Sequence, residues 1–361
     1  MWIVVYYQGM VFEKYEMTIL THNHMTRKST LLFLAFIFSF NWVSAQQDAM
    51  YTKYMFNSLA FNPAFAGSPE YMSIRLLYRE QWWGIEGAPT SQSFSIHSPV
   101  KKRVGLGINV GNDKIGASSS TYANVSYAYR IPFGKGKLSI GLQAGFMNWR
   151  ADWNQLKFKD PVQTDQAFEN MTPSHWLPNI GSGLFYYAPK FYVGFSVPNI
   201  LQNDLRKDIP ENSQIWAMQY RHFYFTAGAA FQVKGPALIF KPSILIKTVG
   251  LLGNFTGDPS SATNIGAPTQ FDLDLSLLFY EALWVGVSLR SAFEAKQFGG
   301  NSSFDSADIW VSYYLANGLR IGAAYDYTLT KLQSFAKGSF ELMLGYDFSY
   351  KTKHINTPRY F

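Results

Sequence analysis

Charged side chains recur at alternate positions within otherwise apolar runs of this sequence. They are Arg75, Arg79, Asp272, Asp274, Arg290, Arg320, Asp326, Glu341 and Asp347. Alternate positions of a strand point to one face, so these charges would share an enclosed interior. There they would either pair with one another or line a water-filled channel. Because both signs are interspersed and no ring of one sign is evident, the pattern favours pairing.

His97 shares a strand face with Ser93 and Ser95, which are the residue types of a Ser-His hydrolase. No strained turn presents either serine as a nucleophile, and no carboxylate is evident to orient the histidine ring. We therefore interpret His97 as an interior or rim residue, and we expect no enzyme activity and no catalytic, metal or cofactor site. The glycines at 105–107 and 141–145 lie in strand-like runs with no helix after them, so they predict small inward residues and not a phosphate loop.

Cysteine is absent from the chain. This excludes thiolate metal sites, cysteine nucleophiles, disulfides and a lipid-modified N-terminal cysteine. The formal charge is +7 over 361 residues, without a basic cluster interleaved with aromatics. We therefore expect no nucleic-acid partner.

The hairpin over 308–330 shows how the charges are positioned. A two-residue turn at 317–318 would place Leu315 opposite Arg320 and mix an apolar face with a polar one. A three-residue loop over 316–318 instead pairs Leu315 with Leu319 and keeps the faces separate. We predict that register, with Gly318 in the left-handed conformation. The apolar face then carries Ile309, Val311, Leu319 and Ile321, and the polar face carries Asp308, Arg320 and Asp326.

Runs of the same period-two type continue through the chain. We predict fourteen strands, over 72–78, 91–98, 104–110, 123–131, 138–146, 180–188, 191–197, 220–233, 237–248, 270–280, 283–292, 308–316, 319–330 and 338–349. Short connections are expected at 99–103, 132–137, 189–190, 234–235, 281–282 and 317–318. Longer loops are expected at 81–90, 111–120, 150–179, 198–219, 249–269, 293–303 and 331–337.

This alternation of connections, with large apolar side chains on one strand face, predicts a barrel in lipid. Charged residues make up 15% of the chain, against about 25% in ordinary soluble domains. No stretch approaches the roughly 20 apolar residues of a membrane-spanning helix. The expected fold class is therefore all-β: a transmembrane antiparallel up-and-down barrel of about fourteen strands with a short N-terminal lead-in segment. Short turns and both termini would lie in the periplasm of a bacterium, with the barrel integral to its outer membrane.

Five segments follow from the same interpretation. Residues 1–24 fit no signal architecture and are expected to be a misplaced start, because Met25 stands where translation would begin. Residues 25–45 have the basic start, apolar run and small final residues of a signal peptide. Residues 46–70 form a periplasmic or luminal lead-in, 71–350 the barrel and 351–361 a periplasmic tail.

Aromatic residues at the strand ends predict the two interfacial girdles of such a barrel. They are Trp82, Trp83, Trp149, Trp153, Tyr186, Tyr187, Tyr346, Phe348 and Tyr350. A carbohydrate-stacking platform is the alternative interpretation of these rings.

The sequence also resembles a known family. The stretches FNPAFAG at 61–67, YREQWWG at 78–84 and GAPT at 87–90 are similar to the N-terminal signature of the PorP/SprF outer-membrane proteins of type IX secretion. The similarity continues through 105–113, 127–131 and 319–327. The matching motif positions are Asn62, Pro63, Ala66, Gly67, Arg79, Gln81, Trp82, Gly87 and Pro89. One departure is Phe340, where the resemblance leads us to expect histidine.

The resemblance implies a non-enzymatic barrel that works with the secretion apparatus. Its partners would be a periplasmic ring, an associated lipoprotein, or a secreted adhesin whose C-terminal domain it helps to export and hold at the surface, as in gliding motility. We expect the lead-in 48–67 and the tail 351–361 to serve the machinery, and the loop 150–179 to serve partners outside. The alternative is a passive outer-membrane channel or a hydrophobic-solute transporter, and an outer-membrane hydrolase is a more distant third.

Overall fold

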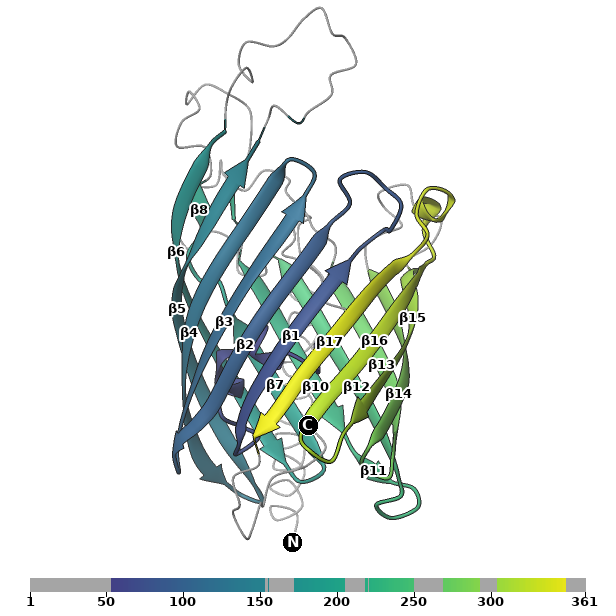
Figure 1. The fold of residues 1–361 in the computed structure, drawn as a ribbon. Helices are drawn as coiled ribbons and strands as arrows, with labels where there is room; N and C mark the ends of the chain where they lie inside the picture. Colours follow the sequence, from purple (N-terminus) through teal and green to yellow (C-terminus); the bar gives the residue numbers. More distant parts are fainter. Residues whose placement is uncertain are drawn as a thin grey trace, which may run out of the picture. The chain divides into compact units, whose positions relative to one another are not determined.

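The computed structural model describes residues 53–152, 155, 172–204, 218–219, 221–249, 269–292 and 304–348 of the chain. Fourteen long antiparallel strands form one closed barrel (Figure 1). They are β1 (Met72–Glu80), β2 (Thr90–Lys101), β3 (Val104–Ile115), β4 (Ser118–Phe133), β5 (Gly136–Ala151), β6 (Ser174–Ala188), β7 (Phe191–Val197), β10 (His222–Ala229), β12 (Leu238–Val249), β13 (Gln270–Phe279), β14 (Leu283–Ala292), β15 (Phe304–Tyr314), β16 (Leu319–Thr328) and β17 (Ser339–Phe348). Each coincides with a predicted strand, so the fold class and strand number are confirmed.

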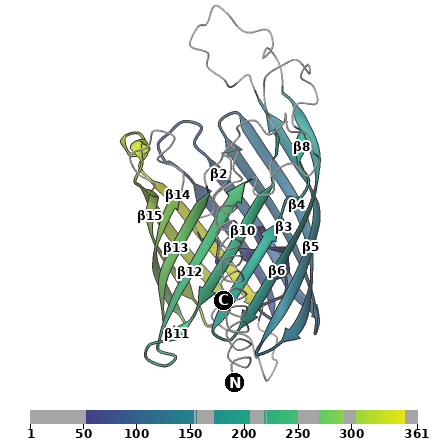
Figure 2. The same cartoon turned by 180° about the vertical axis from the view of Figure 1, so that it is seen from behind.

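Two pairings close the ring. Strand β1 pairs with β17 along its whole length, from Met72 opposite Phe348 to Glu80 opposite Phe340. Strand β10 pairs with β12 on the other side of the barrel, where Figure 2 shows the two strands as neighbours. Every long strand therefore has two partners, which leaves no edge unpaired. Outside the ring, β11 (Phe231–Gln232) extends the β12 pairing and β8 (Asn203–Asp204) pairs with β9 (Met218–Gln219).

The hairpin of β15 and β16 has the predicted register. Tyr313 lies opposite Ile321, and the Leu315 amide donates to the Leu319 carbonyl at 2.8 Å. Gly318 has φ +93°, a conformation that costs a residue without Cβ little. The three-residue loop is therefore confirmed, because it is the connection that keeps apolar side chains on one face.

The two faces of the wall differ as a barrel in lipid requires. Outward side chains such as Leu142, Val125 and Ile309 are 58%, 58% and 63% exposed. Their neighbours on the inner face are buried and polar or small, as with Ser126 and Ser139. In the β15–β16 hairpin, Ile309, Val311 and Ile321 point outward while Asp308, Arg320 and Asp326 point inward, as predicted. No helix among the described residues is long and apolar enough to cross a membrane.

The connections define two ends of the barrel. We call them the short-turn end, where β1 begins and β17 stops, and the long-loop end. One predicted long loop, 111–120, is wrong: β3 and β4 continue to Ile115 and from Ser118, with Gly116 at φ +55° in the tight turn. Polar side chains bridge this extension, since Asn112 Nδ2 donates to Ser119 and Thr121 hydroxyls at 3.2 and 2.7 Å. The mostly polar composition of 111–120 reflects a hairpin that projects beyond the apolar band, not a loop.

The lead-in segment lies inside the barrel. Residues Lys53–Gly67, which we call the plug, contain two short 3₁₀ turns, η1 (Ser58–Ala60) and η2 (Pro63–Phe65). Six of the plug's apolar side chains are 7% exposed or less, namely Tyr54, Phe56, Leu59, Phe61, Ala64 and Ala66. The hydrophobic surface of the plug is therefore covered by the inner wall. The docking role predicted for this segment stays a prediction.

Aromatic side chains gather on the outer surface at both ends. Phe133 and Tyr186 pack edge to face at 6.1 Å between ring centroids at the short-turn end, and Trp83 and Phe340 do so at 6.1 Å near the long-loop end. Trp149 stacks on His175 at 6.0 Å but has the inward parity of Gln143 and Gly145 along β5. Tyr187 is an exception to the predicted girdle, because it is 3% exposed and packs inward. Its alternation with Tyr186 along β6 requires that inward position.

Several predicted features lie outside the described residues. They are the proposed false start 1–24, the signal peptide 25–45, the tail 351–361, Trp153, Tyr350 and most of the loop 150–179.

Candidate functional site: a luminal plug and its cavity

The plug is held on one side by buried ion pairs. Lys53 is fully buried, and its Nζ lies 3.3 Å from Asp308 Oδ1 and 3.7 Å from Asp274 Oδ2. Its backbone amide also donates to Glu341 Oε1 at 3.2 Å. A buried charge is stable only when it is paired and hydrogen-bonded. The contacts of Lys53 therefore stabilise the plug in its position inside the barrel.

An aromatic cluster continues this contact. Phe56 of the plug lies between Trp284 and Trp310, with ring centroids 5.6 and 5.5 Å away. The Trp310 indole donates to Asp274 Oδ2 at 2.7 Å, which ties the ring to the carboxylate that pairs with Lys53. We call the inner face of β13 to β17, with β1, the charged wall.

The opposite side of the lumen is lined by glycines, which we call the glycine wall (β3, β5, β6 and β7). A Cβ added to Gly105 or Gly141 would collide with the plug backbone at Ala66 or Ala64. A Cβ at Gly183 would strike the Asn62 side chain. These positions are glycine because the plug backbone approaches the wall too closely for any side chain.

Hydrogen bonds fix the plug to this side. Asn62 Oδ1 accepts from the Ala64 amide at 3.0 Å, and Asn62 Nδ2 donates to the Leu184 carbonyl at 3.0 Å. Arg130 Nη1 donates to the Gly67 carbonyl at 2.5 Å. Away from the glycine wall, the Tyr54 hydroxyl donates to Ser243 Oγ of β12 at 2.7 Å.

The Ser-His group on β2 is also used by the plug. Ser95 Oγ donates to Asn57 Oδ1 at 2.8 Å, and Ser93 Oγ accepts from Asn57 Nδ2 at 3.2 Å. His97 Nδ1 accepts from the Gly67 amide at 3.2 Å. These three side chains therefore satisfy polar atoms of the plug. Among the residues that the structure describes, no group of three His, Asp or Glu side chains could hold a metal ion.

The nine charged residues singled out in the sequence all lie in the wall. Arg79 bridges Asp326 at 2.7 Å and Glu341 at 3.4 Å. Arg290 makes a two-pronged contact with Asp272, at 2.7 Å from Nε and 3.0 Å from Nη2. Arg75 pairs with Asp347 at 2.6 Å, and Asp274 faces Lys53. Arg320 differs, since no carboxylate of the described residues lies within ion-pair distance of it.

Sequence reasoning missed the plug side of this network. Lys53 was not among the candidate residues, and Asp308 was placed in the lumen but given no partner. The available signal was a lone lysine inside an aromatic stretch that shows no strand period. The cation–π contact between Lys241 and Trp284, in which Nζ lies 3.4 Å from the ring centroid, was also missed.

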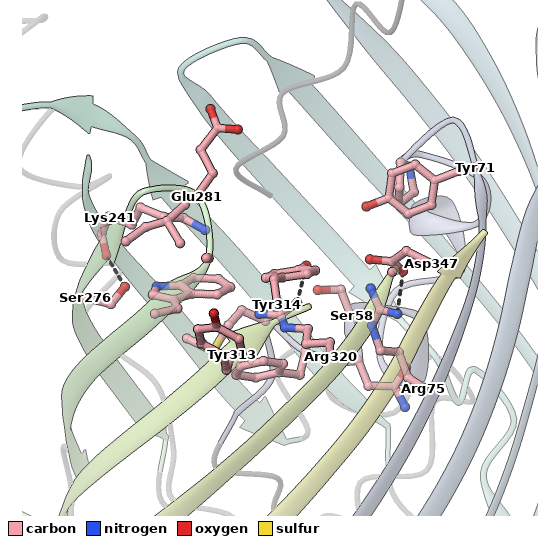
Figure 3. Close-up of a pocket in the computed structure, with 18 of the residues that line it drawn as sticks. Ser58, Tyr71, Arg75, Lys241, Ser276, Glu281, Tyr313, Tyr314, Arg320 and Asp347 are labelled. Atoms are coloured by element: carbon pink, nitrogen blue, oxygen red, sulfur yellow. Dashed lines mark hydrogen bonds and ion pairs between the residues drawn. The ribbon is translucent and has the colours of Figure 1, made fainter. Parts of the chain in front are cut away.

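A cavity of about 690 Å³ lies on the short-turn side of the plug (Figure 3). The plug contributes Met55, Phe56, Ser58 and Phe65 to its lining. The wall contributes basic and aromatic side chains, with Arg320, Tyr314 and the Arg75–Asp347 pair labelled in Figure 3. The plug therefore fills part of the lumen and forms the inner boundary of a ligand-sized space.

The family model for the type IX secretion system membrane protein PorP/SprF matches residues 43–346. This chain belongs to the PorP/SprF family. It is an outer-membrane barrel, in keeping with its apolar outer face and closed sheet. No curated protein sequence shows significant similarity to it.

Solved barrels resemble this PorP/SprF chain only in outline. The Ralstonia pickettii toluene transporter TbuX is 10% identical over 86% of this chain and 96% of its own, with a TM-score of 0.47. The CymD monoaromatic hydrocarbon channel is 12% identical over 84% and 94%, with a TM-score of 0.46. The Acinetobacter baumannii outer membrane protein Omp33 is 9% identical over 78% and 100%, with a TM-score of 0.42.

The residues that carry the family resemblance occupy three places in the PorP/SprF structure. Asn62, Pro63, Ala66 and Gly67 belong to the plug, and Arg79 anchors the charged wall. The others form a compact loop at the long-loop end, where the Gln81 amide donates to the Pro89 carbonyl at 2.9 Å and the Gly116 amide donates to the Gly87 carbonyl at 2.8 Å.

The first residues of that loop are tied to the start of β17. The Trp82 amide donates to Ser339 Oγ at 3.1 Å, and the Trp83 amide donates to the Gly338 carbonyl at 2.7 Å. Phe340, the departure from the expected histidine, packs outside the barrel with Trp83, at 6.1 Å between ring centroids. An aromatic ring suits this outward position as well as a histidine would.

Proposed function

We propose that this protein is a plugged, non-enzymatic component of type IX secretion that works by binding other proteins and not by conducting solutes. Membership of the PorP/SprF family supports the secretion role. The observation that carries the binding role is the plug, which occupies the lumen. It is held by ion pairs of Lys53 with Asp274 and Asp308, by the hydrogen bond from the Lys53 amide to Glu341, and by its close contact with the glycine wall.

In this proposal the short-turn end faces the periplasm and the long-loop end faces outside, as in bacterial barrels generally. Residues 25–45 serve as the signal peptide, and translation starts at Met25. The partners are a periplasmic ring, a lipoprotein or a secreted adhesin of the gliding type, whose C-terminal domain the barrel helps to export and retain. The nine charged wall residues serve to fix the plug and the lumen, and the family motif residues shape the plug and the loop 81–89.

Affinity purification from native membranes tests the partner proposal. The tagged protein should recover secretion-ring proteins or a secreted adhesin, and an equally tagged, unrelated outer-membrane barrel from the same cells should recover neither. Recovery of neither by the tagged protein would overturn the secretion role.

The C-terminal tail gives a second test. Deletion of 352–361 should leave a barrel that still shifts on heating in an electrophoresis gel, while export of the cargo falls. Normal export by the deleted protein would remove the tail from the docking function.

Solute transport is the second candidate, and the cavity with its aromatic lining favours it. Planar-bilayer recordings separate the two functions. A plugged docking protein should show no steady conductance, whereas stable open channels with graded solute permeability would replace the docking proposal with a transport function.

A further inference from the structure

Within the part of the chain that the structure describes, the cavity contains a buried cation that forms no ion pair. Arg320 is 5% exposed and lines the cavity. Its hydrogen bonds go to neutral groups, from Nε to Ser312 Oγ at 3.1 Å and from Nη1 to the Tyr314 hydroxyl at 2.8 Å. Nη2 has no hydrogen-bond partner in the described part of the chain. A guanidinium that is buried in this way is stabilised by an anion.

Neighbouring charges do not supply that anion. Asp347 is the carboxylate on this side of the cavity, and Arg75 holds it at 2.6 Å. The lining as a whole includes Arg75, Lys241 and Arg320 against Asp347 and Glu281. Arg320 therefore offers a single cation, with Nη2 free to donate, to a singly charged ligand.

The remaining surface suits an apolar body. The Arg320 guanidinium carbon lies 3.9 Å from the centroid of the Phe56 ring, 4.4 Å from that of Tyr314 and 4.8 Å from that of Trp284. These rings hold the cation in place and present faces and edges on which an aromatic or aliphatic group can pack. The volume of about 690 Å³ lies within the range of roughly 300–1,000 Å³ typical of small-ligand sites.

From these observations we infer that the cavity binds a monocarboxylate with an aromatic or aliphatic body, with its carboxylate at Arg320. Two sources share this chemistry, the free C-terminus of a peptide that ends in an apolar residue and a free small organic acid. The inference stands on the cavity alone and does not depend on the secretion role.

Isothermal titration calorimetry on the purified full chain in detergent tests it. The probe 3-phenylpropionate should bind saturably and at least about tenfold more tightly than its amide, because a charged hydrogen bond is lost in the amide. The tripeptide Ala-Ala-Phe, as free acid and as C-terminal amide, distinguishes the sources. Tight binding of the tripeptide acid identifies a chain terminus, and tight binding of the small acid alone identifies a free acid.

Variants locate the site. Arg320→Gln should weaken the binding of the acid at least about tenfold, whereas Arg103→Gln, an exposed arginine at the same end, should not change it. Ala282→Trp should also abolish binding, because the indole would occupy the cavity while Arg320 stays in place. This second variant tests the site even if Arg320→Gln fails to fold. Equal binding of acid and amide, no saturable binding of any probe, or full binding by the Ala282→Trp variant would overturn the inference.

Discussion

The two sides of the lumen hold the same plug by opposite means. The glycine wall lacks side chains at the contact, so that backbone meets backbone, with hydrogen bonds from Asn62 to this wall and from Arg130 of the intervening β4 to Gly67. The charged wall extends long side chains inward and binds the plug through Lys53 and the ring of Phe56. The glycine wall thus positions the plug mainly by shape and the charged wall mainly by charge. Variants on the two sides should therefore destabilise the plug in different ways.

The largest effect is expected on the glycine wall. Gly141→Leu should cost at least about 4 kcal/mol of unfolding free energy, because its side chain would overlap the plug backbone, which cannot move aside without leaving its seat. Urea titration in lipid vesicles measures this cost, and bilayer recordings should show new conductance. Ala144→Leu on the outward face of the same strand is the control and should change neither. A stable, silent Gly141→Leu barrel would show that shape does not position the plug.

The charged wall should respond to loss of its central cation. Lys53→Met should cost about 3 kcal/mol, because Asp274 and Asp308 would remain buried without their partner. The double variant with Asp308→Asn should recover part of the loss in the same urea titration. Lys102→Met, at an exposed turn, is the matched control. If the double variant were less stable than the single one, charge pairing would not explain how this side works.

A smaller effect is expected when a hydrogen bond on the glycine wall is removed without a collision. Asn62→Ala loses the contacts to the Ala64 amide and the Leu184 carbonyl, at about 1 kcal/mol each. The unfolding midpoint should fall accordingly while conductance stays absent. Asn112→Ala, whose hydrogen bonds lie at the long-loop end, should have little effect. Conductance in the Asn62→Ala barrel would mean that one side chain, not the glycine surface, seats the plug.

The smallest effect is expected at the rim of the charged wall. The side chains of Arg75 and Asp347 are 12% and 13% exposed, so water partly compensates for a broken pair and Arg75→Gln should cost about 1 kcal/mol. Added salt should reduce the difference between wild type and variant, measured by urea titration at low and high ionic strength. A cost as large as that of Lys53→Met would place the pair among the plug's main anchors.

The sequence predicted the wall much better than its contents. Strict alternation identified each long strand and the three-residue turn at Gly318, because a wall between lipid and a polar lumen imposes a period of two. It failed at 111–120, where both faces meet water and the alternation of polarity disappears. The plug could not be derived from periodicity, since the partners of Lys53 and Asn62 lie far along the chain. The inward glycines were predicted to be small inward residues, but the sequence pattern did not show that the plug backbone packs against them.

The order of the plug and the wall in the chain bears on how the protein is assembled. The plug precedes every strand, yet Lys53 bonds to residues 255 and 288 positions later, on β15 and β17. Contacts so distant in sequence form late and slowly. The plug therefore reaches its final contacts only after β15 and β17 have joined the barrel. A chain that ends before β17 lacks Glu341, the carboxylate that accepts a hydrogen bond from the Lys53 backbone amide. Closure of the barrel and final seating of the plug are thus linked through the last strands.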